Sequence, residues 1–261
     1  MFKWKKVMIH LVATRLNMRI KVYGDPDEEY FHYRCDLFEK TCLKSILSQE
    51  CRDFTWLIFT SDVLPASIEA RMKAYEPYAS LIRVPAQQST LPLSQIKKEI
   101  ENRRKDEEIV ITTNIDSDDI LHKTYTKLLH EISEYEQEVH VGPIIQYWWS
   151  LQGSVIQKHR YPSMFSIIET SKNIRSCFAK HHTQISEIFP KHVYIQAPSV
   201  MVTHYGNAWI HGGRTRGKTD RVEFKEYGVC ESDIVDFLSN KRTFSCMDAR
   251  TRLKNEKERL L

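Results

Sequence analysis

Three aspartates stand close together after an apolar stretch in the middle of the chain. Ile109–Ile115 is rich in β-branched residues, which favour a buried strand. The acids that follow this stretch are Asp116, Asp118 and Asp119. Neighbouring carboxylates repel one another unless a cation lies between them, and Mg²⁺ and Mn²⁺ bind carboxylates together with substrate phosphates. The alternative is that Asp118 or Asp119 caps a helix over Ile120–Tyr135. Because a cap needs only one acid, the pattern favours a site for a metal ion and phosphates.

The first half of the chain alternates between strand-like and helical patterns. Apolar segments predict strands at Val7–Ala13, Phe54–Thr60, Leu81–Val84 and Ile109–Ile115. Helical spacing of apolar residues predicts helices at Phe31–Ser48, Ala66–Tyr75, Pro92–Lys105 and Ile120–Tyr135. This alternation predicts an α/β fold, with a mostly parallel central sheet and helices on both of its faces. The aspartates then lie at the carboxyl edge, where open α/β sheets bind ligands.

The second half predicts a smaller, β-containing part. Val139–Trp149 and Ser154–His159 flank a turn at Leu151–Gly153, which predicts a hairpin or a strand that crosses over the sheet. Other expected elements are a strand-like run at Met164–Glu169, a helix at Lys180–Phe189 and a strand-like run at Tyr194–Thr203. We expect one domain over residues 1–231, with halves at 1–136 and 137–231, followed by a charged helical tail at 232–261.

Composition narrows the class of protein. The formal net charge is +4 over 261 residues, and without a concentrated basic block the sequence predicts no nucleic-acid partner. The six cysteines lack zinc or CxxC spacing, which indicates reduced thiols in the cytosol. Val7–Ala13 is too short and polar to span a membrane, so we expect a cytoplasmic protein. Any membrane contact would be peripheral, through basic residues such as Lys3, Lys5 and Lys6.

Four segments together resemble a known enzyme family. They are Arg34–Gln49, Phe54–Leu57, Thr112–Asp119 and His204–Asn207. A strand that ends in an Asp-x-Asp motif, at this place in the strand order, resembles the GT-A glycosyltransferases. More specifically, the four segments resemble the rhamnosyltransferase-like family of bacterial polysaccharide biosynthesis, and the resemblance covers most of residues 7–207.

The resemblance implies a transferase that moves a sugar, such as rhamnose, from a nucleotide-diphosphate sugar donor to a glycan or lipid-linked acceptor. Residues 1–136 would bind the donor and residues 137–231 the acceptor. The implied cofactor is Mn²⁺ or Mg²⁺, which would stabilise charge on the departing diphosphate. Asp116 would contact the ribose or the metal, and Asp118 would ligate the metal. The residues implied at the nucleotide sugar are Thr14, Arg15, Asn17, Asp62, Asp116, Ser117 and Asp118.

Several of these residues also have a plainer interpretation. Arg15 would otherwise form a surface salt bridge, and Asp62 a turn or a helix cap before Pro65. Asp118, as a strand-end acid, is expected to add little to the core. Asp118→Ala should therefore abolish metal-dependent nucleotide binding and leave the fold intact.

Two features of the C-terminal part complete the expected site. The resemblance implies that His204 binds the metal or the diphosphate, and the alternative is a core histidine with satisfied hydrogen bonds. The basic loop His211–Lys218 contains Arg214, whose guanidinium suits a diphosphate. This loop is either a lid over the donor or a solvated surface loop.

An inverting transfer, which we expect here, needs a general base that takes the proton of the acceptor hydroxyl. Glu169 closes the apolar run Met164–Glu169, and partial burial would raise its pKa toward a useful value. Glu187 and Asp119 are the competing candidates. The plainer role for Glu169 is an acid at the start of a helix.

Other functions stay open. An α/β sheet with clustered aspartates also suits a nucleotidyltransferase or a metal phosphohydrolase. The first strand ends in Thr14-Arg15, however, and lacks the nucleophilic carboxylate or glycine-rich loop that those enzymes use. A degenerate GT-A domain acting as a non-catalytic partner is the third possibility. The presence of Asp116, Asp118 and His204 argues against it.

Overall fold

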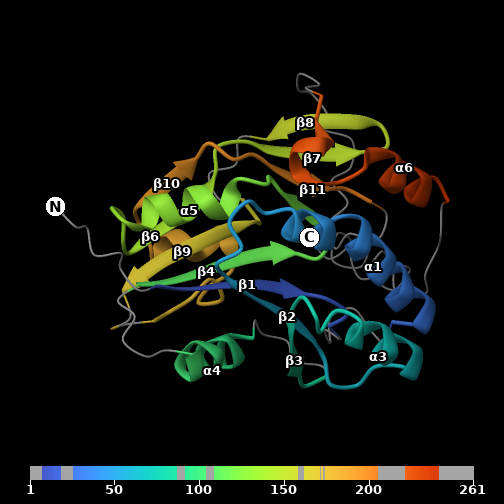
Figure 1. The fold of residues 1–261 in the computed structure, drawn as a ribbon, viewed down its shortest axis with the longest axis horizontal. Helices are drawn as coiled ribbons and strands as arrows, with labels where there is room; N and C mark the ends of the chain where they lie inside the picture. The colour runs from blue at the N-terminus through green and yellow to red at the C-terminus, as the bar shows by residue number, and fades with distance from the viewer. Residues whose placement is uncertain are drawn as a thin grey trace, which may run out of the picture.

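A mostly parallel β-sheet organises the computed structural model. The model describes residues 8–18, 26–86, 92–103, 109–157, 162–170, 172, 174–204 and 221–240. The strands of the main sheet are β1 Met8–Arg15, β2 Thr55–Ser61, β3 Ser80–Val84, β4 Ile109–Asp116, β6 Val139–Pro143, β9 Phe165–Thr170 and β10 His192–Ile195. In the described part of the chain they form the order β10-β6-β9-β4-β1-β2-β3 (Figure 1). β9 runs antiparallel to β4 and β6, and the other neighbouring pairs are parallel. The predicted α/β class is confirmed.

Helices cover both faces of this sheet. The α-helices are α1 Glu28–Lys40, α2 Cys42–Leu47, α3 Ala66–Lys73, α4 Leu93–Arg103, α5 Tyr125–Ser133 and α6 Glu231–Ser239, and the 3₁₀ helices are η2 His182–Glu187 and η3 Phe224–Tyr227. Figure 1 shows α4 and α5 on opposite sides of the sheet. Alternate side chains of β1 serve the two layers, because successive residues of a strand point to opposite faces. Leu11 belongs to the apolar cluster that contains Ile96 of α4, and Val12 to the cluster that contains Leu129 of α5.

A second, smaller sheet lies beside the main one. Its strands are β5 Asp119–Leu121, β7 Gln146–Ser150, β8 Gly153–Gln157 and β11 Ser199–Val202, in the order β5-β11-β7-β8. β7 and β8 form the predicted antiparallel hairpin, and Gly153 in its turn has a φ of 121°, which favours glycine. The strand β5 begins with Asp119, the last acid of the motif, so this sheet begins at the motif.

The segment expected as one helix over Ile120–Tyr135 is divided. Its first residues form β5, and α5 begins only at Tyr125 after an N-cap position at Thr124. Neither Asp118 nor Asp119 therefore caps this helix. The tertiary pairing of β5 with β11 overrides the helical pattern of the sequence.

Other single elements of the prediction are also divided. Phe31–Ser48 forms α1 and α2, because the backbone leaves helical geometry at Thr41, with φ −119° and ψ −92°. Val139–Trp149 and Tyr194–Thr203 each supply one strand to the main sheet and one to the second sheet. Of the helix predicted at Lys180–Phe189, the structure forms only the short 3₁₀ helix η2.

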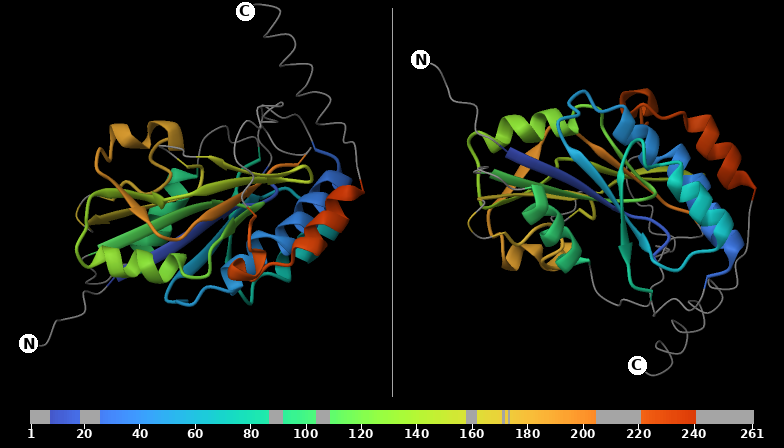
Figure 2. Two further views of the ribbon diagram at one scale, coloured as in Figure 1. Left: turned by 90° about the horizontal axis from the view of Figure 1, so that it is seen from above. Right: turned by 60° about the horizontal axis from the view of Figure 1, so that its bottom comes forward.

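The helix α6 packs against α1 and the second sheet. Figure 2 shows α1 and α6 side by side in both views. Their contact includes the rings of Tyr33 and Phe237, which stack with centroids 5.1 Å apart. Trp149 of β7 joins the same apolar cluster. In the part of the chain that the structure describes, no helix is long and apolar enough to span a bilayer.

Candidate functional site

The candidate site lies where the parallel strands β1 and β4 end. The two strands run in register, so their last residues, Arg15 and Asp116, lie side by side. The guanidinium of Arg15 donates to Asp116 Oδ1 at 2.7 Å, and both side chains are partly exposed, at 29% and 37%. The adjacent strand β2 ends at Ser61, before the exposed Asp62, at the same edge of the sheet. This carboxyl edge therefore presents charged groups to solvent, as the sequence predicts.

A buried polar network continues from this edge into the protein. Arg34 of α1 donates to Ser117 Oγ at 2.6 Å and to the two carboxylate oxygens of Asp118 at 3.2 and 3.3 Å. His204 donates from Nε2 to Asp118 Oδ2 at 2.8 Å, and its Nδ1 lies 2.9 Å from the hydroxyl of Tyr33. The network joins α1, the acidic motif and the end of β11, three segments that are far apart in the sequence.

Local structure places the members of this network. Tyr33 and Arg34 are consecutive residues of α1, whose first turn is capped by the Asp27 carboxylate accepting from the Tyr30 amide at 2.8 Å. Asp118 stands in the tight connection between β4 and β5. His204 follows β11, which pairs with β5, so the pairing of the second sheet brings the histidine to the acid.

The carboxylates of the motif have opposite electrostatic environments. Burial alone would raise the pKa of Asp118, but the Arg34 charge and the His204 hydrogen bond together hold that pKa well below its ordinary value. Asp119 is also buried, and burial together with the charges of Asp118 and Asp116 raises its pKa well above the ordinary value. One acid is thus fixed as an anion, and its neighbour holds its proton more tightly.

The expected metal ligands do not surround one point in this arrangement. Among the described residues, no group of three or more His, Cys, Asp or Glu side chains is placed to hold a metal ion. Both carboxylate oxygens of Asp118 accept from Arg34, and His204 uses both ring nitrogens in hydrogen bonds. Asp116 is the partly exposed acid and is bound to Arg15. The set Asp116, Asp118 and His204 therefore does not fit a three-ligand metal site as it stands.

Thr14 and Asn17 are both buried and form hydrogen bonds within the protein. Thr14 is fully buried, and its hydroxyl accepts from the indole nitrogen of Trp56 at 3.0 Å. Asn17 is nearly buried and donates to Cys35 Sγ at 3.1 Å, which holds the loop after β1 against α1. Both were predicted to line the nucleotide pocket. The structure corrects this for Thr14, whose hydroxyl points into the core.

Asp62 takes part in a local turn. Its carboxylate accepts from the amide of Ala86 at 2.8 Å, and its own amide donates to the Val84 carbonyl at 2.9 Å. Asp62 therefore links the ends of β2 and β3 and stays exposed beside the site. Arg214 and the loop His211–Lys218, predicted to contact the diphosphate, lie outside the described residues.

Glu169 is not a general base at this site. It pairs across strands with Val110, six residues before Asp116 on β4, so it lies about 20 Å away, at the opposite edge of the sheet. Its carboxylate is fully buried and accepts from the amides of Arg175 and Ser176 at 2.8 and 2.7 Å. Burial raises the pKa of Glu169 to about 7, as the sequence suggested. The prediction of its role is wrong because β9 runs antiparallel to β4.

Three residues of the site received no role from the sequence. Arg34 begins the segment that carries the family resemblance, and Tyr33 directly precedes it. An arginine opposite clustered acids is the signal that would have found the pair. The third is His181, exposed at the start of η2. Burial lowers its pKa, and the charges of Arg15 and Asp116 act on it in opposite directions.

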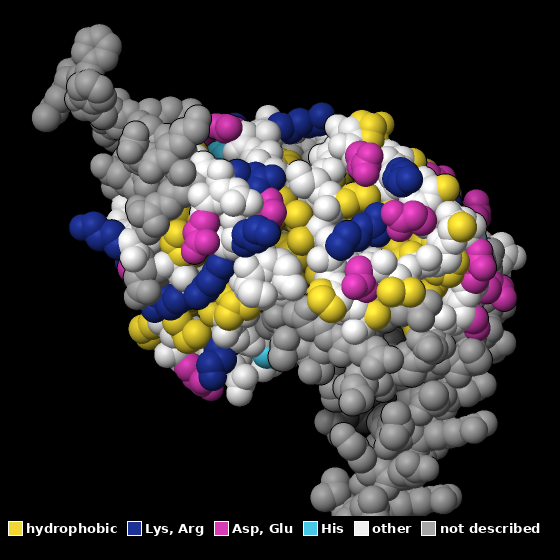
Figure 3. Space-filling view, turned by 90° about the horizontal axis from the view of Figure 1, so that it is seen from below, with side chains coloured by type: hydrophobic (Ala, Val, Ile, Leu, Met, Phe, Trp, Pro, Cys, Tyr) yellow, Lys and Arg dark blue, Asp and Glu magenta, His cyan; other side chains and the backbone are white. Residues whose placement is uncertain are grey.

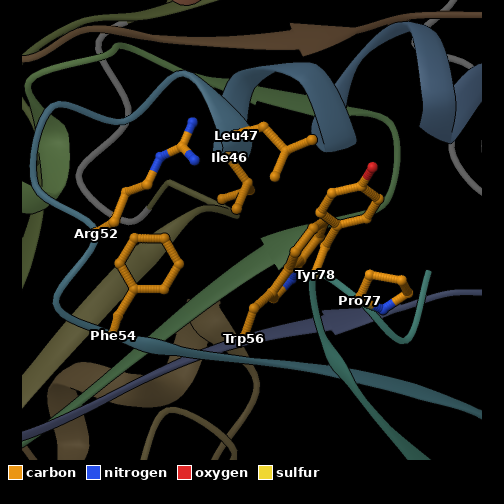
Figure 4. A pocket seen from close by; sticks show the side chains of 7 residues that line it. All are labelled: Ile46, Leu47, Arg52, Phe54, Trp56, Pro77 and Tyr78. Carbon is orange, nitrogen blue, oxygen red and sulfur yellow. The ribbon is translucent and has the colours of Figure 1, made fainter.

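A small pocket lies apart from the motif. It has a volume of about 200 Å³, and Figure 4 shows its lining residues Ile46, Leu47, Arg52, Phe54, Trp56, Pro77 and Tyr78. Trp56 also makes the hydrogen bond to Thr14, so this side chain links the pocket wall to the buried carboxyl end of β1. Figure 3 shows a face on which Lys and Arg side chains intermix with Asp and Glu, without a patch of one sign.

Comparison with solved structures finds only weak similarity. The TarS fragment 1–349 of S. aureus is similar at 13% identity over 56% of this chain and 37% of the fragment, with a TM-score of 0.36. The same fragment in complex with UDP gives 13% identity, coverage of 54% and 36%, and a TM-score of 0.33. A "putative nucleotide-diphospho-sugar transferase" from Desulfovibrio desulfuricans G20 gives 8% identity, coverage of 77% and 83%, and a TM-score of 0.37. At these scores the structures carry no argument about function, and this chain spans only about a third of the TarS fragment.

Sequence families give a clearer answer. No curated protein matches the chain. Residues 13–209 match the family model described as "Putative rhamnosyl transferase". The match contains the end of β1, the acidic motif and His204, and it covers most of the chain. The protein therefore belongs to this rhamnosyl transferase family.

Proposed function

We propose that the protein is a GT-A glycosyltransferase, which moves a sugar from a nucleotide-diphosphate donor to a hydroxyl of a glycan or lipid-linked acceptor. Rhamnose is the sugar that the family description suggests. The observation that carries the proposal is the Arg15–Asp116 pair at the carboxyl edge of the sheet, adjoining the buried network of Arg34, Asp118 and His204. We expect the protein on the cytoplasmic side, with at most peripheral membrane contact.

The exposed pair suits a nucleotide diphosphate. A guanidinium binds phosphate oxygens through paired N–H groups, and Arg15 reaches the edge with its guanidinium partly exposed. Asp116 then has a carboxylate oxygen available for the ribose hydroxyls. As the acceptor oxygen bonds to the anomeric carbon, the bond from that carbon to the diphosphate oxygen breaks. Arg15 would stabilise the negative charge that collects on the leaving diphosphate.

The buried network fixes the geometry of this edge. Arg34 clamps Ser117 and Asp118 directly after Asp116, so the turn that carries Asp116 cannot move freely. Catalysis depends on such positioning, because small displacements of reacting groups have large costs. We therefore assign Asp118 and His204 to holding the site in shape.

Asp119 replaces Glu169 as the general base that we propose. It belongs to the same motif, and its pKa is raised by burial and by the neighbouring carboxylates. Its one described hydrogen-bond donor is Ser163, at 3.4 Å. A carboxylate with a raised pKa is a stronger base for an acceptor hydroxyl. A single displacement with this base would invert the anomeric centre.

The requirement for Mn²⁺ or Mg²⁺ stays a prediction, and the same experiment tests it. Thermal unfolding is measured with UDP, dTDP and the corresponding nucleosides, each with Mn²⁺ and with EDTA. A ligand that binds only the folded state raises the melting temperature. We expect diphosphates to stabilise the wild type and Arg15→Gln to lose most of this effect. Arg103→Gln, which removes an ion-paired arginine of α4, is the matched control.

The products formed during turnover distinguish a glycosyltransferase from a nucleotidyltransferase. Release of nucleoside diphosphate from a nucleotide sugar supports the glycosyltransferase. Formation of a nucleotide sugar from a nucleoside triphosphate and a sugar phosphate indicates a nucleotidyltransferase instead. If none of the nucleotides binds, the protein is a non-catalytic partner and the proposal is wrong.

A further inference from the structure

A second group of chemically active side chains lies near the amino end of β1. The thiol sulfur of Cys51 is 3.3 Å from Nδ1 of His130 on α5. Nε2 of His130 is 2.8 Å from Nδ1 of His10 on β1. The three residues come from different parts of the sequence, and the packing of α5 over the sheet brings them into one row.

The row continues into the core without a break. Nε2 of His10 is 2.9 Å from Thr113 Oγ1, which is 2.7 Å from Ser166 Oγ. Ser166 Oγ in turn is 3.1 Å from the hydroxyl of Tyr125. Each of these groups can both donate and accept, so the chain of hydrogen bonds fixes the orientation of His10.

This row is separate from the candidate site for the nucleotide sugar. His10 precedes Arg15 by five residues on β1, which corresponds to about 17 Å along the strand. No residue of the Arg34–Asp118–His204 network belongs to it. The role of the row is therefore not explained by the proposed glycosyl transfer.

The arrangement has the form of an activated nucleophile. Such sites place a nucleophile within hydrogen-bond reach of a base, and a third group orients that base. Cys51 is the nucleophile, His130 the base and His10 the orienting group. Burial, and next the positive charge that His130 can carry, lower the pKa of His10 well below its ordinary value, so His10 stays neutral and can accept from His130. An imidazole beside a thiol favours the reactive thiolate.

Cys51 and its base are accessible. Both side chains are partly exposed, and the next residue, Arg52, is exposed and adds positive charge. Arg52 and Phe54 also line the 200 Å³ pocket of Figure 4. The other charged groups of this segment are Glu50, which pairs with Lys127 at 3.8 Å, and the exposed Asp53. A small molecule can thus approach the thiol from solvent.

The other described cysteines lack this combination. Cys35, Cys42 and Cys177 are buried, and burial raises the pKa of each thiol. Cys230 is exposed, but its described partners are the hydroxyl of Ser232 at 3.0 Å and the carboxylate of Asp233, not an imidazole. Cys230 is therefore an internal control for an accessible thiol.

We propose that Cys51 is a modification site, a reactive thiol that exchanges with low-molecular-weight disulfides. His130 takes the proton of Cys51, and the thiolate attacks one sulfur of the disulfide. A new sulfur–sulfur bond forms as the old one breaks, and the departing thiolate receives the proton from His130. Cys51 is oxidised to a mixed disulfide, and half of the small disulfide is reduced to a thiol.

The test compares Cys51 and Cys230 in one protein. The full chain is alkylated with iodoacetamide between pH 6.0 and 7.5, and peptide mass spectrometry gives a rate for each cysteine. A thiol with a pKa near 8.5 is alkylated about thirtyfold more slowly at pH 6.0 than at pH 7.5, because its thiolate fraction falls as pH is lowered. Between pH 7.5 and 6.0 the rate for Cys51 should fall by a smaller factor than the rate for Cys230, because His130 lies beside the Cys51 thiol. The comparison of slopes removes differences in accessibility, because accessibility scales a rate equally at each pH.

The variant His130→Gln tests whether His130, rather than other neighbouring groups, sets the reactivity of Cys51. In this variant the pH dependence of Cys51 should become that of Cys230, while Cys230 is unchanged. With glutathione disulfide at pH 7, wild-type Cys51 should form the mixed disulfide before Cys230 does, and His130→Gln should abolish that preference. If His130→Gln fails to fold, the wild-type slopes decide alone. Equal slopes for the two cysteines, or alkylation of Cys51 without any mixed disulfide, would overturn the proposal.

Discussion

His204 and Asp118 meet at 2.8 Å inside the protein, with 0% and 9% of their side chains exposed. The contact closes the second sheet onto the acidic motif, since His204 follows β11 and Asp118 precedes β5. Arg34 of α1 supplies the positive charge that balances the carboxylate of Asp118. Asp118, the middle acid of the motif, thus has a structural role inside the protein. Asp116, the first acid, is the one presented to a ligand.

Asp118→Asn should destabilise the protein strongly. The substitution leaves the buried guanidinium of Arg34 without its carboxylate, and removal of one partner of a buried ion pair costs about 3–5 kcal/mol. Chemical denaturation measures this loss. The expectation from sequence, that Asp118→Ala leaves the fold intact, is therefore reversed.

Asp116→Asn is the matched control. Its ion pair with Arg15 is partly exposed, and such pairs contribute about 0–1 kcal/mol. The variant should fold with nearly unchanged stability but bind nucleotide diphosphates more weakly. A stable Asp118→Asn protein, or an Asp116→Asn protein as unstable as Asp118→Asn, would contradict the division of roles.

Thr14→Val should affect stability and leave nucleotide binding unchanged. Valine keeps the shape of the side chain but removes the acceptor of the Trp56 indole N–H, and a buried donor left without a partner costs about 1–3 kcal/mol. Thr14→Ser retains a hydroxyl and should recover most of this loss. Both variants are compared by thermal unfolding and by titration with nucleoside diphosphates. Loss of binding at full stability would restore Thr14 to the nucleotide pocket.

The main sheet could be predicted from the sequence because its strands are continuous apolar runs. Five of the strands, including β1 and β4, fall within two residues of their predicted bounds. The carboxyl-edge position of Asp116 followed from the same patterns. The meeting of Arg15 with Asp116 follows once β1 and β4 are parallel neighbours.

The failures have a common cause in long-range pairing. Ile120 joins a strand because β11, some eighty residues later, pairs with β5. Glu169 stands at the wrong edge because β9 is antiparallel to β4, and an apolar run does not reveal its direction. Local patterns likewise cannot show that Arg34 reaches Asp118, since that contact depends on how α1 packs.

Glu169→Gln should remove a pH dependence of stability. The pKa of Glu169 rises from 4.5 to about 7 in the folded protein, so the folded state binds the proton more tightly than the unfolded state. The associated stability is fully present below about pH 4.5 and is lost as pH rises through 7. The shift corresponds to on the order of 3 kcal/mol. The free energy of unfolding of the wild type, measured from pH 4.5 to 8, should therefore fall relative to that of Glu169→Gln as pH rises.

The other ionisable groups are the same in both proteins, so their contributions cancel in the difference between the two free energies of unfolding. Glutamine retains an oxygen that can accept from the amides of Arg175 and Ser176. A constant difference between the two proteins at all pH values would show that these donors, rather than burial, set the protonation of Glu169.

Asp119→Asn should lower kcat and leave the KM for the donor nearly unchanged. A general base acts only as the acceptor hydroxyl loses its proton, so its loss slows the chemical step by about 10²–10⁴-fold. Asparagine keeps an oxygen to accept from Ser163 and removes the charge, so the fold should survive. Steady-state rates of nucleoside diphosphate release, with saturating acceptor, measure the effect.

Glu169→Gln supplies the comparison for Asp119→Asn, since both changes neutralise a buried carboxyl whose pKa is raised. Of these two carboxyls, only that of Glu169 lies at the far edge of the sheet. The variant Glu169→Gln should therefore keep kcat within about threefold of wild type, which is a smaller loss than removal of a general base causes. The pH dependence of kcat is an independent test of Asp119 as the general base. A base at Asp119 requires kcat to rise through a pKa above that of an ordinary carboxyl, and the rise should vanish in Asp119→Asn. Equal losses of kcat in both variants would mean that each carboxyl acts through the fold, and that the base lies elsewhere.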